Sequence, residues 1–283
     1  MTGQTLLLSG VPRAGTSLAC RLLDQAADTV ALSEPFRLAD FEARDSIDGA
    51  LERIEASIAE VRRGILVDAQ APSTHVDGAL NDARVAESVS GSELRRPQGE
   101  QGVIQLDRSL SAHFRLVIKH NALFAALLPQ LSRRYHCVAL VRNPLPVLAS
   151  WQTVDLPVNA GRLPAGELYD RSLQNSLAAE SDRLQRQLAI LDWFFAAFRP
   201  LQADGRVVRY EDLVASNGGA LYAACEIEHS PTETLGSRND SGLYHTAGVP
   251  ALLDALLARD GQWLELYTRA DLKAAADALE AGA

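Results

Sequence analysis

The sequence is short of basic residues. It contains 27 Lys and Arg against 36 Asp and Glu, which gives a formal net charge of −9 at pH 7. Proteins whose partner is nucleic acid or an anionic membrane usually carry a basic footprint, so we expect neither partner. Any anion that the chain binds must be held by a local cluster of donors, because the field of the whole chain repels it.

Cysteines are few and long apolar runs are missing. Cys20, Cys137 and Cys225 are an odd number, lie far apart and form no CxxC pair, which favours buried, reduced thiols. No apolar run approaches the roughly 18 residues that a membrane span needs. The N-terminal residues lack the basic start of a signal peptide, so we expect a strand there and a cytoplasmic protein without a membrane span.

Short apolar runs alternate with amphipathic segments along the 283 residues, and 47% of the residues are hydrophobic. This order predicts an α/β fold, with a mostly parallel central sheet flanked by helices, in one domain over residues 1–283. The expected strands are residues 5–9, 29–33, 65–68, 115–119, 136–141 and 206–210. The expected helices follow residue 16 and cover about 45–63, 121–133, the segment opened by Asn143-Pro144, 164–198, 250–257 and 260–279.

Residues 71–102 break this alternation. They are rich in Ser, Gly, Pro and charged residues, which predicts a mobile loop or lid, with simple disorder as the alternative.

The segment after the first apolar run contains two glycines at the spacing of a phosphate-binding loop. Residues 10–17, GVPRAGTS, have the frame G-x-x-x-x-G-K-[ST], but Thr16 occupies the lysine position and a cation, Arg13, lies inside the loop. Glycines and a helix N-terminus still offer N–H donors to a phosphate. Without the lysine that bridges β- and γ-phosphates, the loop suits a 5′-phosphate derivative other than ATP or GTP. An ordinary β–α turn is the alternative.

A second anion site is indicated by residues 140–150, LVRNPLPVLAS. Arg142 ends an apolar strand, and Ser150 lies about two helical turns further on. A guanidinium and a hydroxyl that converge beside a helix N-terminus can bind an anion. A structural helix cap is the alternative.

Residues 9–18, SGVPRAGTSL, resemble the 5′-phosphosulfate loop of sulfotransferases, most closely the GVPRSGTT form of the tyrosylprotein sulfotransferases. Residues 140–150 look like the motif in which an Arg and a Ser, eight positions apart, grip the 3′-phosphate of 3′-phosphoadenosine-5′-phosphosulfate (PAPS). The resemblance implies a P-loop-like, three-layer α/β fold. It also implies transfer of a sulfuryl group from PAPS to an acceptor hydroxyl without a metal, which releases 3′,5′-ADP (PAP).

The resemblance assigns roles to particular residues. Arg13 would reach the sulfuryl group, and Arg142 and Ser150 would hold the 3′-phosphate. Residues 207–214, VVRYEDLV, and 236–242, GSRNDSG, resemble further family segments that contact the nucleotide. The remaining nucleotide contacts implied in this way are Ala14, Gly15, Thr16, Ser17, Leu18, Tyr210, Ser237 and Arg238.

The resemblance also implies catalytic groups. Glu34 lies 21 residues after Arg13, the offset of the catalytic glutamate in the tyrosylprotein sulfotransferases, and could take the acceptor proton. Lys119, in IKHNAL, resembles a lysine that neutralises charge on the leaving oxygen. His120 and His113 are alternative bases, because some sulfotransferases use histidine.

Residues 45–102 and about the last 40 residues match nothing in the family, and we expect acceptor specificity there. The Golgi members carry a membrane anchor and disulfides that this sequence lacks, so a small-molecule, carbohydrate or lipid-linked acceptor fits better than a secretory protein. The oligomeric state stays open.

Two other functions stay open as well. One is an ATP-dependent small-molecule kinase, for which Asp68 after an expected strand would be the Mg²⁺ ligand. The other is a non-catalytic nucleotide-binding module.

Overall fold

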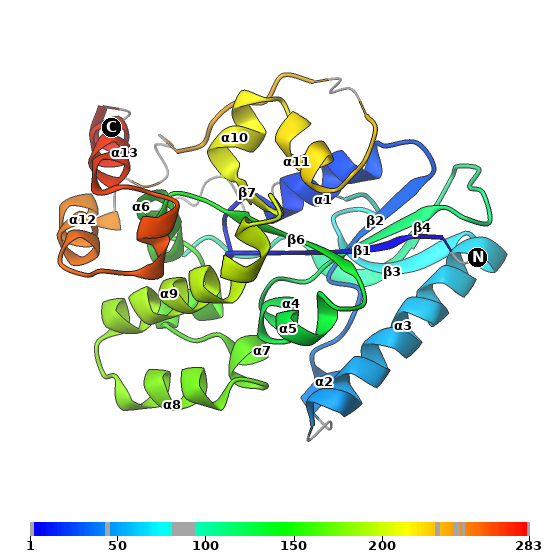
Figure 1. The fold of residues 1–283 in the computed structure, drawn as a ribbon, viewed down its shortest axis with the longest axis horizontal. Helices are drawn as coiled ribbons and strands as arrows, with labels where there is room; N and C mark the ends of the chain where they lie inside the picture. Colours follow the sequence, from blue (N-terminus) through cyan, green and yellow to red (C-terminus); the bar gives the residue numbers. More distant parts are fainter. Residues whose placement is uncertain are drawn as a thin grey trace.

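The computed structural model describes residues 3–42, 46–80, 94–229, 233–239, 244 and 247–281. Its centre is a five-stranded sheet in the order β2-β5-β1-β6-β7, and every pair in it is parallel (Figure 1). The prediction of an α/β fold around a parallel sheet is confirmed. The strands are β1 (Thr5–Gly10), β2 (Thr29–Ser33), β5 (Arg115–Lys119), β6 (His136–Val141) and β7 (Val207–Arg209).

Both faces of this sheet are covered. Successive side chains of a strand point to opposite faces, so Leu6 and Leu8 of β1 enter one core while Leu7 enters the other. The smaller core lies under three helices that Figure 1 shows together on one side of the sheet. These helices are α1 (Thr16–Asp24), α10 (Tyr210–Ala215) and α11 (Gly219–Ala224).

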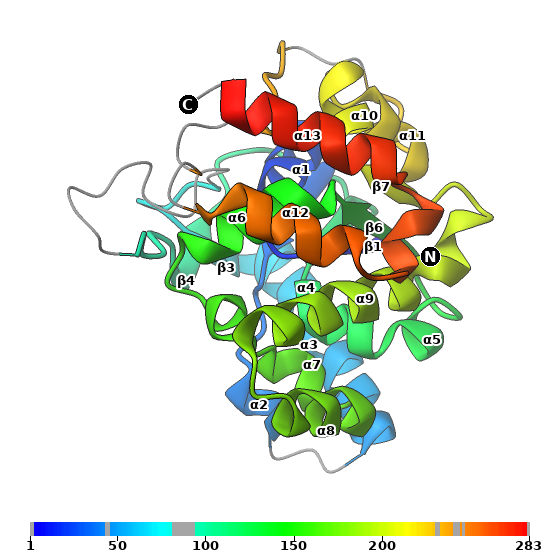
Figure 2. The same ribbon diagram turned by 90° about the vertical axis from the view of Figure 1, so that its left-hand side faces the viewer.

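The larger core lies on the opposite face. Figure 2 shows α13 above α6 and α12, which lie at one level, and α9 below them. The elements on this side are α2 (Ala39–Glu42), α3 (Ile47–Asp68), α4 (Asn121–Ala126), α5 (Leu128–Leu131), α6 (Pro144–Gln152), η1 (Pro157–Ala160), α7 (Pro164–Glu167), α8 (Arg171–Ala179), α9 (Arg183–Gln202), α12 (Val249–Leu257), η3 (Gln262–Glu265) and α13 (Arg269–Ala281).

Two expected boundaries are wrong. Residues 65–68 are the last turn of α3 and not a strand, because the helical spacing of buried Ile54, Ile58, Val61 and Ile65 continues to that point. The helical zone expected over residues 164–198 is divided into α7, α8 and α9.

The expectation of a mobile loop over residues 71–102 is wrong at both ends of this range, because each end belongs to a strand. β3 (Gln70–His75) and β4 (Glu100–Gln105) form an antiparallel pair. Small and polar residues, including Ser73 and His75, fill the buried positions of β3, so its alternation was hidden in a sequence without an apolar run. Residues 81–93 lie outside the described residues.

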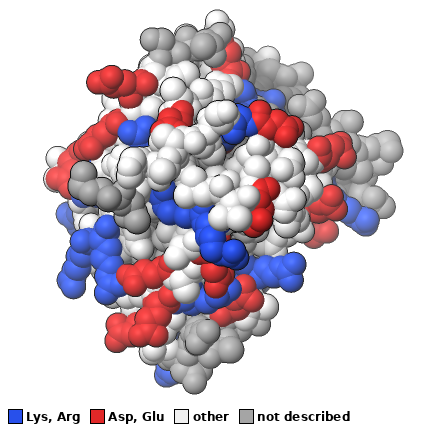
Figure 3. Space-filling model, turned by 90° about the vertical axis from the view of Figure 1, so that its right-hand side faces the viewer, with Lys and Arg blue, Asp and Glu red and all other residues white. Residues whose placement is uncertain are grey.

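The three cysteines are buried thiols. Burial raises the pKa of Cys137 to about 12 and that of Cys225 further still. Within the described ranges, no helix combines the length and the apolar character needed to cross a membrane. The face drawn in Figure 3 carries basic and acidic side chains interspersed among uncharged residues.

The sheet order fixes where a ligand can enter. The chain leaves β1 toward β2 on one side of the sheet, whereas it leaves β6 toward β7 on the other. Ligands of open parallel sheets bind beyond the carboxyl ends of the strands at such a reversal. The glycine loop follows β1 and Arg142 follows β6, so both expected anion sites lie at this point.

Candidate active site

The glycine loop has a constrained backbone. Gly15 adopts a φ of 87°, and a Cβ there would lie 2.8 Å from a ring carbon of Tyr210. Both the conformation and the close approach therefore require glycine. Gly15 is also the N-cap of α1 and makes no side-chain cap, so the first-turn N–H groups, starting from Thr16, have no capping side chain. The backbone thus supports the expected phosphate-binding role.

Arg13 lies in the middle of this loop with a φ of 73°, which is uncommon for a residue with a side chain. Its Nε donates to Ser150 Oγ at 3.1 Å. The neighbouring Trp151 donates through Nε1 to the carbonyl oxygen of Pro12 at 2.9 Å. Two consecutive residues of α6 therefore hold the loop.

Arg142 joins the loop to the C-terminal part of the chain. Its Nη1 donates to the carbonyl oxygen of Arg13 at 3.1 Å and its Nη2 to that of Arg238 at 2.6 Å. Its guanidinium stacks 4.6 Å from the ring centroid of Tyr210. The Tyr210 hydroxyl accepts from the N–H of Arg238 at 3.0 Å. These contacts bring four of the expected nucleotide-binding residues together.

A cavity of about 770 Å³ opens beside these groups. Five arginines line it together with two tyrosines, and the expected contacts Gly15, Thr16, Ser17, Leu18 and Ser237 lie on its wall. Its lining also includes Arg13, Arg21, Arg95, Arg142, Arg238, Tyr210 and Tyr244.

Two expected contacts lie elsewhere. The Ala14 side chain is buried in the core, and its N–H donates to the carbonyl oxygen of Val11 at 3.0 Å. Ser150 is fully buried behind Arg13, and it is not among the residues that line the cavity. The structure therefore gives Ser150 the role of holding Arg13.

The cavity wall is strongly positive. Burial lowers the pKa of Arg13 to about 10; Tyr244 opposes this shift, and the charges of Arg95, Arg142 and Arg238 add to it. Burial raises the pKa of the Tyr244 phenol, but Arg142 and Arg13 lower it more, so the net shift is downward. The contacts described for Arg13 and Arg142 are to uncharged oxygens, which solvate these cations without neutralising them. An anion would complete this cluster.

A second cavity, of about 400 Å³, lies on the other side of the loop. Arg13, Thr16 and Ser17 line both cavities. Glu34, Lys119 and His120 line only the second one. The expected catalytic groups and the expected nucleotide contacts therefore occupy different cavities that meet at Arg13.

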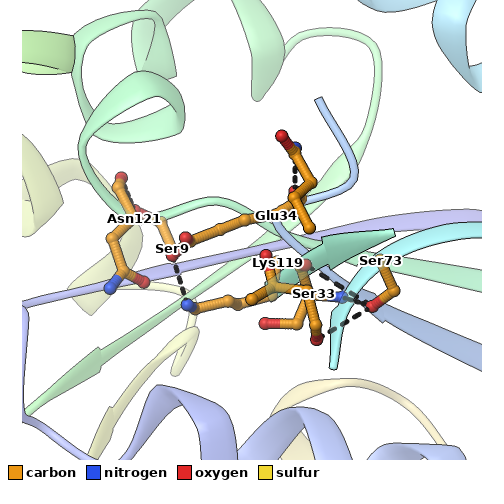
Figure 4. Close-up of polar contacts among 8 residues, drawn as sticks. Ser9, Ser33, Glu34, Ser73, Lys119 and Asn121 are labelled. Carbon is orange, nitrogen blue, oxygen red and sulfur yellow. Dashed lines mark hydrogen bonds and ion pairs between the residues drawn. The ribbon is translucent and has the colours of Figure 1, made fainter. Parts of the chain in front are cut away.

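Glu34 and Lys119 form an ion pair with 2.5 Å between Oε1 and Nζ (Figure 4). The Lys119 side chain is 2% exposed and that of Glu34 35%, so the carboxylate is the partner that solvent or substrate can reach. Pairing with an ammonium favours the carboxylate form of Glu34, which is the form that accepts a proton.

The backbone at Glu34 is also held firmly. It has a φ of 50°, and its N–H donates to the carbonyl oxygen of Lys119 at 2.7 Å. The pair of strands β3 and β4 supplies two further contacts. Gln101 Nε2 donates to the carbonyl oxygen of Glu34, and the N–H of Ser33 donates to Ser73 Oγ, which Figure 4 shows. A non-glycine residue in the left-handed region costs about 1–3 kcal/mol, which these contacts offset. Such strain at two site residues, Arg13 and Glu34, is a common feature of active sites.

The two histidines differ. His120 lines the second cavity, and its ring stacks at 6.4 Å from that of Phe36. His113 is exposed and precedes β5, so it lies at the opposite edge of the sheet from Lys119. His113 is therefore wrong as an alternative base, whereas His120 stays a candidate.

The kinase alternative loses its proposed metal ligand, because Asp68 belongs to a helix and does not follow a strand. In the described part of the chain, no group of three or more His, Cys, Asp or Glu residues is arranged to hold a metal ion.

Sequence reasoning missed Arg95, Tyr244 and Trp151. Arg95 fell in a segment expected to be a loop, and Tyr244 has no motif around it. Trp151 directly follows the Arg142–Ser150 motif, and this position could have identified it as a residue of the same helix near the site.

Comparison with known proteins gives one distant structural similarity. No family model matches the chain, and no curated protein does. Among solved structures, the chain is similar to the crystal structure of sulfotransferase STF1 from Mycobacterium tuberculosis H37Rv (type1 form), with 11% sequence identity and a TM-score of 0.37. The match covers 99% of this chain and 77% of that one. At this level of similarity the activity has to be inferred from the site itself.

The arginine cluster predicts that a small polyanion stabilises the protein. Inorganic pyrophosphate should raise Tm more than sodium chloride of equal ionic strength, because it binds the folded state; at about 100 times Kd, binding adds about 2.7 kcal/mol. Thermal unfolding of wild type and Arg142→Met would measure this, and the variant should respond less. Equal effects of pyrophosphate and chloride would contradict an anion site.

Proposed function

We propose that the protein is a sulfotransferase that transfers a sulfuryl group from PAPS to a hydroxyl of an acceptor. The observation that carries this proposal is the meeting of two cavities at Arg13, Thr16 and Ser17, one lined by arginines and the other by the Glu34–Lys119 pair. A group-transfer enzyme needs such an arrangement, because donor and acceptor must approach one another from opposite sides of the transferred group.

The arginine-lined cavity supports PAPS as the donor. PAPS carries a phosphosulfate at its 5′ end and a phosphate at its 3′ position, so it requires cations at two places. Arg13 in the glycine loop and Arg142 at the end of β6 come from different strands and both line this cavity. Thr16 stands where the lysine of nucleoside triphosphate enzymes would be, which favours PAPS over ATP.

The second cavity supports the chemistry. Glu34 accepts the proton of the acceptor hydroxyl as its oxygen attacks sulfur. A bond forms between the acceptor oxygen and sulfur, while the bond between sulfur and the 5′-phosphate oxygen breaks. The products are a sulfate ester and PAP, whose 5′-phosphate keeps the bonding electron pair. Arg13, which lines both cavities, is suited to stabilise charge on the transferred group.

The ion pair links the two catalytic residues. When Glu34 takes up the proton it becomes neutral, and Lys119 loses its counter-charge. The ammonium of Lys119 then favours a new anionic partner at the moment when negative charge grows on the leaving oxygen. The buried position of Lys119 makes this electrostatic coupling stronger than it would be in water.

The nucleotide assignment predicts selective stabilisation by PAP. In EDTA, PAP should raise Tm through preferential binding to the folded protein, and AMP should do much less because it lacks the 3′-phosphate. ATP with and without magnesium serves as the control for the kinase alternative. If AMP stabilises as well as PAP, the 3′-phosphate site is wrongly assigned.

The base assignment predicts that Glu34→Gln lowers kcat about 10²–10⁴-fold, because the amide keeps the shape but cannot accept a proton. PAP affinity, measured by calorimetry, should stay near the wild-type value. A more acidic acceptor such as a nitrophenol should partly restore the rate, because it needs less help in losing its proton.

Lys119→Met provides the matched control for this prediction. It should also lower kcat, since Lys119 acts in the transition state, but the acidic acceptor should not restore its rate. Full activity of Glu34→Gln with an aliphatic alcohol would exclude Glu34 as the base, and His120 would be the next residue to replace. Binding of PAP without turnover of any acceptor would favour a non-catalytic module.

A further inference from the structure

The cavity next to Glu34 combines polar residues with a nonpolar wall. Its uncharged polar residues are Thr16, Ser17, Thr74, His120 and Asn121. Among the residues that line it, the charged ones are Arg13, Glu34 and Lys119, the groups already assigned to the chemistry. The opposite wall comes from the segments before and within η1 and α7, with Leu38 beside them. It consists of Leu156, Pro157, Val158, Leu163, Pro164 and Ala165.

This wall is nonpolar because buried side chains occupy its backbone polar groups. Gln187, which is fully buried, donates through Nε2 to the carbonyl oxygens of Val158 and Asn159 at 3.0 and 2.9 Å. Glu167, which is 6% exposed, accepts from the N–H of Leu163 at 2.6 Å. Because these backbone groups are already hydrogen-bonded within the protein, the wall offers mainly side-chain carbons to a ligand.

The same bonds make the wall rigid. Arg162 donates to both oxygens of Glu167, which fixes the turn that leads into α7. Val158 and Leu163 are 3% and 5% exposed and pack into the larger core. A preformed nonpolar wall favours a ligand of matching character, because little ordering is needed on binding.

We propose that the acceptor is a small, uncharged alcohol or phenol whose body is mostly nonpolar; this rests on the proposed sulfotransferase function. A nonpolar body gains free energy by leaving water against this wall. A sugar would place some of its hydroxyls against this wall of carbon side chains, and buried hydroxyls without partners are costly. An anionic acceptor would have to place its charge against the side-chain carbons of this wall, where nothing replaces its hydration. The cavity of about 400 Å³ suits a small molecule and not a polymer.

A panel of acceptors on one skeleton tests the proposal. The compounds are 4-tert-butylphenol, anionic 4-hydroxybenzoate, cationic tyramine and the polyhydroxylated phenol arbutin. We expect kcat/KM with PAPS to be at least about 10-fold higher for the neutral nonpolar phenol, the lower limit for discrimination in an apolar pocket. Calorimetric binding of the same compounds to the PAP-loaded protein measures recognition without turnover.

Two matched variants connect the preference with the wall. Leu156→Gln should raise KM for 4-tert-butylphenol about 10-fold and leave PAP affinity unchanged, because Leu156 lines only the acceptor cavity. Leu66→Gln is the control, since Leu66 is 49% exposed on α3 and lines neither cavity.

The outcomes separate the two proposals. Preference for arbutin or 4-hydroxybenzoate would overturn the nonpolar acceptor while PAPS-dependent turnover still supports the sulfotransferase. Binding of PAP without calorimetric binding of the neutral phenol would overturn it as well. Failure to bind PAP at all would refute the proposed function itself.

A separate observation concerns Arg95, which lines the arginine-rich cavity although it comes from the segment that leads into β4. Its side chain is anchored by Nη2, which donates to Thr153 Oγ1 at 2.6 Å, and its backbone pairs with the residues after α6. Arg95 is 6% exposed, and its buried Nε has no hydrogen-bond partner in the described part of the chain. Arg13 and Arg95 line the same cavity, and the charge of Arg95 lowers the pKa of Arg13.

We infer that Arg95 is a further donor-binding residue, which acts beside Arg13 on the phosphosulfate and supplies a positive charge that the lysine-free glycine loop lacks. This assignment also rests on the proposed function. Arg21 lines the same cavity, but we do not assign it this role. It forms a 2.7 Å ion pair with Glu233 and so already has a counter-charge.

Arg95→Met and Arg21→Met remove one charge each from the same cavity. We expect Arg95→Met to weaken PAP binding by roughly 10- to 100-fold, as for a lost hydrogen bond between charged groups, and Arg21→Met to weaken it by less than about 3-fold. Arg95→Lys keeps the charge, so its affinity for PAP should lie between those of Arg95→Met and wild type. This variant provides the test if Arg95→Met does not fold. Equal affinities of the Arg95→Met and Arg21→Met proteins, or wild-type affinity of Arg95→Met, would overturn the assignment, while PAP binding by wild type would still support the sulfotransferase.

Discussion

The partial burial of the Arg13 guanidinium is the constraint on which the rest of the site depends. Removing a cation from water is costly unless other groups replace its hydration. Here Ser150 provides an uncharged oxygen, while the neighbouring arginines make the burial harder, as the lowered pKa of Arg13 reflects. An anion beside the loop would offset this cost. This property separates the cavity from an ordinary polar cleft.

Helix α6 is the element that makes this burial tolerable. Asn143 caps it by accepting from the N–H of Leu145 at 3.1 Å, so its first turn is fixed at the end of β6. From there Ser150 and Trp151 reach back to the glycine loop, and Arg142 just before the helix binds the loop carbonyl. One short segment thus holds both the side chain and the backbone of the loop. Its ridge of small and apolar residues packs against α12 and α13 on the outer side.

The hairpin of β3 and β4 plays the corresponding role on the acceptor side. It fastens Ser33 and the carbonyl of Glu34, which allows Glu34 to keep its left-handed backbone. The segment that leads into β4 contributes Arg95 to one cavity and Pro97 and Gly99 to the other. Donor and acceptor cavities therefore share a wall as well as the glycine loop. Within a chain of net charge −9, the positive field is local to one of these cavities.

What the sequence determined by itself were the features encoded within a few consecutive residues. The apolar runs of β1, β2, β5 and β6 identified the central strands, and the spacing of glycines around Arg13 identified the loop. The sequence did not predict the pair of β3 and β4, because β3 has small and polar residues at its buried positions. This strand is ordered by its pairing with β4. Such pairing depends on residues about 30 positions apart, which local periodicity does not register.

Only the tertiary structure decided which functional groups meet. Parallel pairing aligns Ser33 with Lys119, and this register places the next residue, Glu34, within ion-pair distance of the Lys119 ammonium. Ser150, expected at a phosphate, is fully buried and accepts from Arg13, because α6 turns its buried face toward the loop. Arg95 reaches the cavity only because its backbone pairs with the residues after α6. Side chains from distant segments converge through strand register and helix packing, and these are set by long-range contacts that no local pattern contains.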